Sequence, residues 1–330
     1  MESTLQVPLS FWIGFFVIIG TLLALDLGVF NRKVHVVTVP EAARWVTIWV
    51  SLGLLFNLGI LYFFGAEVAL TFLTGYLIEY SLSIDNIFVF VLVFSAFGVP
   101  PQYQHRVLFW GVLGAIIMRA VMIFAGVALI ERFDWIMYVF GAFLVFAGGR
   151  MLFEKDGPPA DIRQNPILKL VQRFIPVTDR FEGQKFFTVK DGRRMATPLF
   201  LVLVVVELTD LVFAVDSIPA IFAITTEPFI VFTSNIFAIL GLRSLYFLLA
   251  GVIHRFVYLK TGLAVILAFV GIKMLLADVW HMPTLLSLGV IVGVLALSII
   301  ASLLRAPAEP ATPAEHDHSQ VLPPDDETGR

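Results

Sequence analysis

Residues 198–222 read PLFLVLVVVELTDLVFAVDSIPAIF, and this stretch decides the class of the fold. A helix needs about 20 mostly apolar residues to cross roughly 30 Å of hydrocarbon, and the stretch is long enough to do so. Three acidic residues, Glu207, Asp210 and Asp216, interrupt it. Because a charge at the centre of a membrane helix costs about 2.5–3.5 kcal/mol, the stretch indicates a transmembrane helix that carries a functional polar site.

Comparable apolar runs recur along the chain, which has 330 residues, 59% of them hydrophobic and 14% charged. This balance excludes an ordinary soluble domain. We predict about nine transmembrane helices. Their approximate ranges are 10–30, 45–64, 67–97, 107–130, 135–153, 198–222, 229–252, 261–278 and 284–304. The sequence therefore predicts an all-α polytopic membrane protein, with a transmembrane domain over residues 1–304. We expect the third and sixth helices, which carry several acids, to be bent or interrupted.

Basic residues predict the orientation. Lysine and arginine follow the first, third, fifth and seventh spans, with nine of them in the connection 154–197, whereas the intervening connections contain only Arg132. Since basic residues are retained in the cytoplasm, the N-terminus is predicted to lie outside and the C-terminus in the cytoplasm. In the connection, the dipeptide Asp191-Gly192 offers a hairpin turn, but we favour a solvated irregular loop. The acid- and proline-rich tail, 305–330, is predicted to be disordered.

Composition also excludes several kinds of function. The net charge of −3 argues against a nucleic-acid binder. The chain contains no cysteine, which removes disulfides, thiolate metal sites and cysteine nucleophiles. Oxygen or nitrogen atoms must therefore hold any bound metal, and we expect no permanently bound cofactor.

Two halves of the chain share a pattern of polar residues. The pairs that match without a gap are Glu79 with Asp210, Asp85 with Asp216, and Asn86 with Ser217. After one gap, Arg119 matches Arg243. A repeat of three spans enters the membrane from the opposite side, so we predict an inverted repeat relating spans 3–5, about 67–153, to spans 6–8, about 198–278. Many secondary transporters are built in this way and bind their substrate between the two halves.

The acids inside the spans need compensation. The candidate metal ligands are the acids of the two motifs and their polar partners: Glu79, Asp85, Asn86, Glu207, Asp210, Asp216 and Ser217. Arg119 and Arg243 can neutralise two of the five carboxylates, which leaves a bound cation or protons to compensate the others. Carboxylate, amide and hydroxyl oxygens suit Mn²⁺, Ca²⁺ or Mg²⁺ and do not choose among them.

Helical spacing divides these residues between faces. On an unbroken helix Glu79, Ser83 and Asn86 share one face, whereas Asp85 lies about 120° away. Local unwinding, at Ser81-Leu82-Ser83 and at Pro219 in the other motif, would bring the acids together. We therefore predict that Asp85 and Asp216 meet in one cavity.

The motifs EYSLSIDN, at 79–86, and ELTDLVFAVDSIPA, at 207–220, resemble the paired signatures of the TerC family. The segment AILGLRSLYF, at 238–247, strengthens the resemblance, which extends over about residues 10–304 and is closest to the alkali-inducible Alx branch. The resemblance implies manganese export across the bacterial inner membrane and points to the same seven ligand residues. It ranks Mn²⁺ above Ca²⁺ and Mg²⁺. The expected partners are this cation, the lipid bilayer and, as a counter-ion, protons; the oligomeric state stays open.

Two other classes of function remain. A membrane scaffold or redox and stress modulator needs no transport, although the chain offers neither a thiol nor a cofactor motif. An intramembrane aspartyl enzyme would use two facing acids, although the Gly-x-Gly-Asp motif expected of it is absent. We therefore expect a transporter and not an enzyme.

Overall fold

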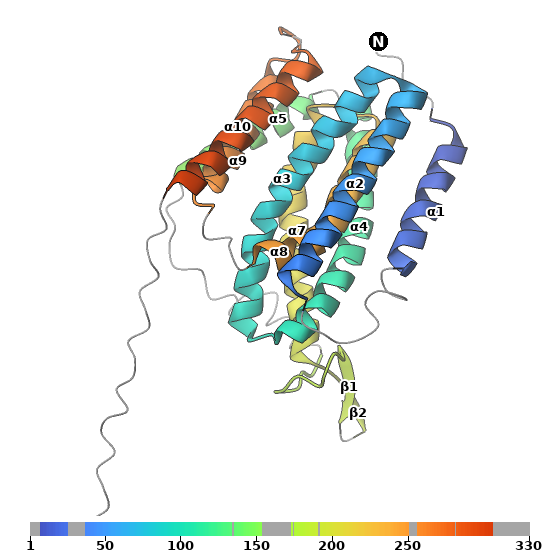
Figure 1. Cartoon of the computed structure of the whole chain (residues 1–330), viewed down its shortest axis with the longest axis vertical. Helices are drawn as coiled ribbons and strands as arrows, with labels where there is room; N and C mark the ends of the chain where they lie inside the picture. Colours follow the sequence, from blue (N-terminus) through green and yellow to red (C-terminus); the bar gives the residue numbers. More distant parts are fainter. Residues whose placement is uncertain are drawn as a thin grey trace, which may run out of the picture.

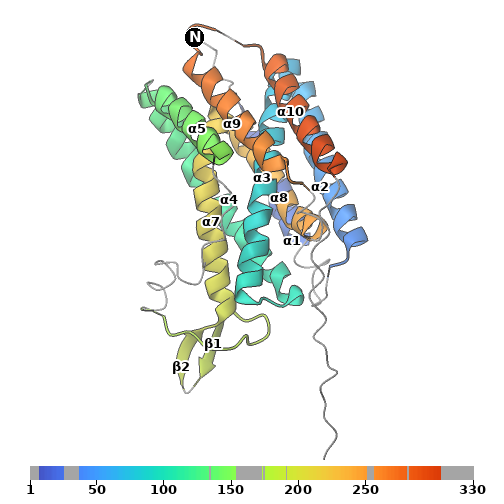
Figure 2. The same cartoon turned by 90° about the vertical axis from the view of Figure 1, so that its left-hand side faces the viewer.

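The computed structural model describes residues 7–25, 37–133, 135–153, 173, 175–190, 192–250, 256–280 and 282–305. These residues form a bundle of helices with a small hairpin at one end (Figures 1 and 2). The helices are α1 (Leu9–Leu25), α2 (Val39–Phe64), α3 (Ala66–Phe97), α4 (Pro101–Arg132), α5 (Ile136–Phe153), α7 (Pro198–Phe222), α8 (Pro228–Leu249), α9 (Leu259–Leu275) and α10 (Thr284–Leu304). The strands are β1 (Phe187–Lys190) and β2 (Arg193–Ala196).

Seven of the helices in the described part of the chain are long and apolar enough to cross a membrane, namely α2, α3, α4, α5, α7, α8 and α10. The prediction of an all-α multi-pass membrane protein is therefore confirmed. The helices α1 and α9 have 17 residues each, so the count of nine spans stays a prediction. Two helices begin earlier than predicted, α2 at Val39 and α4 at Pro101, because each starts with a polar turn that hydropathy does not detect.

The expected interruptions of the third and sixth predicted helices are absent. α3 is continuous through Ser81. The Ser81 hydroxyl donates a hydrogen bond to the carbonyl of Leu77, so its hydrogen-bond donor has a partner within the helix. α7 is continuous through Pro219, which lies in its last turn; the proline removes one backbone hydrogen bond, the one to the carbonyl of Val215, without ending the helix. Gly98, in the left-handed conformation at φ 61°, ends α3 ahead of the proline pair that starts α4.

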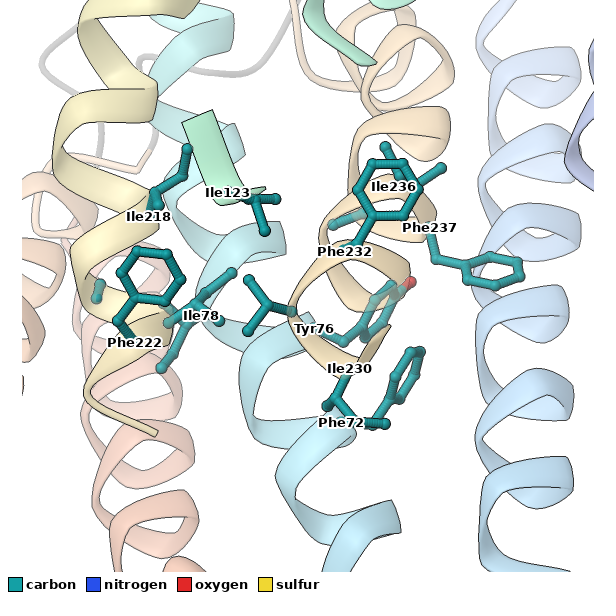
Figure 3. Packing of buried hydrophobic residues seen from close by; sticks show 14 of the residues in the cluster. Phe72, Tyr76, Ile78, Ile123, Ile218, Phe222, Ile230, Phe232, Ile236 and Phe237 are labelled. Carbon is teal, nitrogen blue, oxygen red and sulfur yellow. The ribbon is translucent and has the colours of Figure 1, made fainter. Parts of the chain in front are cut away.

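α8 lies at the centre of the bundle. Every residue from Phe229 to Tyr246 is buried, and α2, α3 and α4 all pack against it. Figure 3 shows Phe232, Ile236 and Phe237 of α8 among the apolar side chains of the neighbouring helices. This apolar packing shields the inner faces of α3 and α4 from lipid.

α5 and α9 pack closely against each other, and glycines make the close approach possible. A Cβ atom added at Gly148 would lie 2.6 Å from the carbonyl oxygen of Ala264 and 2.8 Å from the backbone nitrogen of Ala268. One added at Gly271 would lie 2.7 Å from the carbonyl oxygen of Gly141 and 2.8 Å from the nitrogen of Val145. Only glycine allows the two backbones to approach so closely.

The expectation of an irregular loop was wrong for residues 187–196. β1 and β2 pair antiparallel there, with Lys190 opposite Arg193 and Gly192 in the turn at φ 72°. A glycine that adopts positive φ closes the turn, as the dipeptide had offered. The guanidinium of Arg106 on α4 lies 5.2 Å from the centre of the Phe186 ring, which ties the connection to the helical bundle.

Candidate metal-ion site

α3 and α7 lie side by side and run in opposite directions (Figure 2). Asn86 Nδ2 donates a hydrogen bond to Asp210 Oδ1 at 3.5 Å, and Ser217 lies close to Glu79, since one nitrogen of Arg119 contacts the side chains of both. The two helices are antiparallel, and the same separation of seven residues divides Glu79 from Asn86 on α3 and Asp210 from Ser217 on α7. One register of the two helices therefore places both pairs side by side. The two motif acids therefore lie on either side of the centre of the α3–α7 contact.

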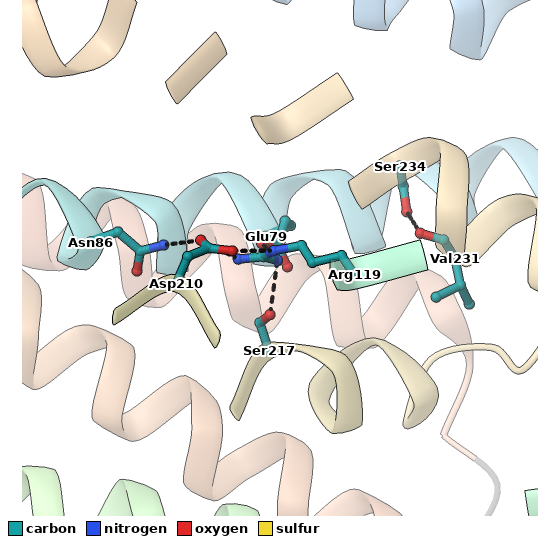
Figure 4. A network of polar contacts seen from close by, with 7 residues as sticks. All are labelled: Glu79, Asn86, Arg119, Asp210, Ser217, Val231 and Ser234. Atoms are coloured by element: carbon teal, nitrogen blue, oxygen red, sulfur yellow. Dashed lines mark hydrogen bonds and ion pairs between the residues drawn. The ribbon is translucent and has the colours of Figure 1, made fainter. Parts of the chain in front are cut away.

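Arg119 of α4 joins these two acids (Figure 4). Its Nε donates to Asp210 Oδ2 at 3.2 Å and its Nη2 to Asp210 Oδ1 at 3.1 Å, a two-pronged ion pair. Its Nη1 forms an ion pair with Glu79 Oε1 and lies 3.1 Å from Ser217 Oγ. All four residues are at most 2% exposed. The structure thus places Arg119 where two buried carboxylates need positive charge.

One face of α3 carries oxygen atoms without a hydrogen-bond donor. They are Glu79 Oε2, Ser83 Oγ and Asn86 Oδ1, on residues that are 0%, 1% and 1% exposed. Residues three and four apart lie above one another on a helix, so these oxygens form a row with Ser83 in the middle. Buried polar atoms without partners are uncommon, and each calls for an explanation such as water, an ion or a catalytic role.

The other three motif acids lie outside this network. Asp85 is half-buried and interacts electrostatically with Lys260 of α9, and Asp216 does so with Arg150 of α5. From the α3–α7 register and 1.5 Å per residue, Asp85 and Asp216 lie about 7 Å apart along the helix axes. That they share one cavity stays a prediction.

Glu207 lies against Gly114 of α4. An added Cβ atom at Gly114 would overlap all three outer atoms of the Glu207 carboxylate. Glu207 is one turn from Asp210 and is half-buried, so the glycine leaves space for a carboxylate beside the buried network. The sequence pointed to Glu207 as an acid within the span and through the resemblance of its motif, whereas Gly114 carried no signal of its own.

Arg243 of α8, which matches Arg119 in the sequence repeat, is 7% exposed. It lines a small cavity together with Asp210, and apolar residues of α3, α4, α7 and α8 form the other walls. The water-accessible volume is about 10 Å³, close to what one water molecule needs. Arg243 therefore lies near the buried network, on the side of Asp210.

Among the described residues, no three acidic or histidine side chains form a group that would hold a metal ion. The acids instead separate into one buried pair, Glu79 and Asp210, and three flanking acids. The helices do not unwind to gather them, as the spacing argument had required. Sequence reasoning also placed Ser83 on the shared face of α3 without counting it among the ligands, although its spacing from Glu79 and Asn86 pointed to it.

The chain was compared with known proteins. The integral membrane protein TerC family matches residues 64–309. An "uncharacterized membrane protein" of Myxococcus xanthus is 54% identical over 92% of this chain and 95% of its own length. The Escherichia coli K12 protein named "Putative membrane-bound redox modulator Alx" is 51% identical over 90% of this chain and 95% of its own. No solved structure matches the chain. The family match covers most of the chain, and the chain therefore belongs to the TerC family of integral membrane proteins.

Proposed function

We propose that this protein is a secondary transporter that exports a hard divalent cation across the bacterial inner membrane, with Mn²⁺ as the leading candidate. The observation that carries the proposal is the row of unpartnered oxygens on α3, Glu79 Oε2, Ser83 Oγ and Asn86 Oδ1, beside a buried carboxylate pair. An ion beside Ser83 would have Glu79 on one side and Asn86 on the other. Carboxylate, hydroxyl and amide oxygens are the ligands that Mg²⁺, Ca²⁺ and Mn²⁺ prefer.

The choice of Mn²⁺ comes from the resemblance to the TerC family, because the oxygens do not separate the three cations. The proposed direction, out of the cytoplasm, has the same origin. Asp85, Glu207 and Asp216 lie within two turns of the buried pair and are only partly buried. In the proposal they attract the cation on its way to the pair, and they exchange protons when the cation leaves.

We further propose that α3–α5 and α7–α9 form an inverted repeat, and the contacts between α5 and α9 support it. Gly148 and Gly271, Gly141 and Ala264, and Val145 and Ala268 are each separated by 123 positions. Exchanging the two helices converts the Gly148 contacts into the Gly271 contacts, and the corresponding distances agree within 0.1 Å. Such a two-fold relation is what the polar pattern of the sequence predicts. With nine spans and an outside N-terminus, the axis would lie in the membrane plane.

Transport of Mn²⁺ by the purified protein in liposomes tests the proposal. We expect protein-dependent Mn²⁺ flux that Asp216→Asn strongly reduces, since a neutral amide is a weaker ligand and carries no charge. Asp278→Asn is the matched control, because Asp278 is exposed at the end of α9 and contacts Tyr138. Wild-type protein that is folded and moves neither Mn²⁺ nor Ca²⁺ nor Mg²⁺ would remove the transporter proposal.

The competing functions have less support from the site. The name of the Alx relatives refers to redox modulation, which matches the modulator alternative, but this chain has no cysteine for thiol exchange. An aspartyl enzyme needs two carboxyls that share a proton or a water molecule. Glu79 and Asp210 instead have a guanidinium between them. Modulation of the cellular redox state by wild-type protein without metal flux would favour the first alternative.

A further inference from the structure

The buried acid pair already holds a cation, the guanidinium of Arg119. Both carboxylate oxygens of Asp210 accept hydrogen bonds from the guanidinium. Glu79 Oε1 forms an ion pair with the guanidinium, whereas Glu79 Oε2 has no hydrogen-bond donor. The planar guanidinium forms a bidentate contact with the carboxylate of Asp210, and such charge-assisted hydrogen bonds are strong. In this conformation, Arg119 occupies the place between the carboxylates where a divalent cation would have its strongest attraction.

Charge decides whether a metal ion and Arg119 can occupy this place together. Two carboxylates and one guanidinium have a net charge of −1, and adding a divalent cation makes it +1 in a region at most 2% exposed. If the guanidinium leaves when the divalent cation enters, the net charge is zero. Like charges at close distance in a poorly solvated site repel strongly, so exchange is favoured over joint occupation.

We propose that Arg119 is a tethered counter-cation that alternates with the transported metal at Glu79 and Asp210. This inference rests on the proposed transport function and adds a role for one residue. In the metal-free state Arg119 compensates one of the two negative charges and joins α3, α4 and α7. Entry of the metal displaces the guanidinium, and return of Arg119 helps to expel the metal. Arg119 is thus a residue that sets metal affinity, and a purely structural arginine would not compete with the metal.

The test is equilibrium Mn²⁺ binding to the purified full-length protein, measured together with thermal unfolding with and without Mn²⁺. Arg119→Gln removes the competing charge, so its Kd for Mn²⁺ should be at least ten-fold lower than that of the wild type. Ten-fold tighter binding corresponds to a Mn²⁺-induced rise of the unfolding midpoint that is larger by about 2 °C than in the wild type. Arg106→Gln is the matched control on the same helix, and its Kd should equal that of the wild type.

Two further variants keep the test decisive. If Arg119→Gln cannot be purified even with Mn²⁺, Arg119→Lys keeps the charge but loses the two-pronged contact, and its Kd should be at least three-fold lower than that of the wild type. The double variant Arg119→Gln/Asp210→Asn should lose the gain in affinity, because it also removes one of the two carboxylates that attract the metal. Wild-type Mn²⁺ flux together with unchanged or weaker binding by the Arg119 variants overturns this inference alone. Absence of both flux and binding in the wild type overturns the proposed function and this inference with it.

Discussion

Replacing Gly148 by alanine should destabilise the protein by separating α5 from α9. The new Cβ atom would lie 2.6 Å from the Ala264 carbonyl oxygen and 2.8 Å from the Ala268 nitrogen, whereas ordinary contacts begin near 3.4 Å. Both atoms belong to the backbone, so no side chain can move aside and the helices must separate by about 0.5–1 Å. A gap of that size loses roughly a quarter to a half of each van der Waals contact across it. Overpacking of this kind costs about 1–3 kcal/mol.

The neighbouring glycine provides the control. An added Cβ atom at Gly149 meets no atom within 4 Å, so Gly149→Ala should gain up to about 1 kcal/mol from helix propensity alone. The two variants should therefore differ by about 1–4 kcal/mol. Reversible unfolding of the purified protein in mixed detergent micelles, followed by circular dichroism, measures this difference. Stabilities that agree within about 0.5 kcal/mol would refute the reasoning and, with it, the tight crossing of the two helices.

The remaining predictions concern the acids. Asp85→Asn and Asp216→Asn should each reduce Mn²⁺ flux into liposomes strongly while the protein keeps its unfolding midpoint. Full flux in both variants would remove these acids from the pathway. Asp210→Asn should in addition lower the stability by about 3–5 kcal/mol, because it breaks a buried ion pair, and a calorimetric midpoint equal to that of the wild type would contradict this. Gly114→Ala should displace the Glu207 carboxylate and change flux as Glu207→Gln does, namely in affinity or pH dependence more than in maximal rate. Its stability should change little, since only the end of a flexible side chain must move; flux kinetics that match the wild type would show that the position of Glu207 is unimportant.

The general architecture could be predicted because membrane spans depend on length and apolarity, which are visible in a sequence. The two acidic motifs and their pairing could also be predicted, since equal spacing of polar residues is a local pattern. Helix ends were less accurate at α2 and α4, where the helix extends beyond its apolar run. The hairpin at 187–196 was not predicted, because only the turn dipeptide indicates it and the surrounding composition is typical of a loop.

The distribution of the acids between two environments could not be predicted from the sequence. Helical spacing separated Asp85 from Glu79 correctly, and the need for positive charge pointed to Arg119, but nothing in the sequence shows that α4 brings Arg119 between Glu79 and Asp210. That contact joins residues 40 and 91 positions apart and depends on how three helices pack. Local unwinding was expected because it would bring all the acids into one site. Continuous helices with the acids in a buried pair and a flanking set satisfy the hydrogen bonds of the backbone at a lower cost.

The central position of α8 has a consequence for biosynthesis. Of the seven helices long enough to span the membrane, α8 has the lowest mean hydropathy, and its interior carries Thr233, Ser234 and Asn235. A helix of this composition gains least from contact with lipid when it leaves the translocation machinery. It becomes stable in the bilayer when α2, α3 and α4 surround it. Retention of α8 in the membrane and closure of the bundle around Arg119 should therefore occur as one cooperative step, after the earlier helices have been inserted.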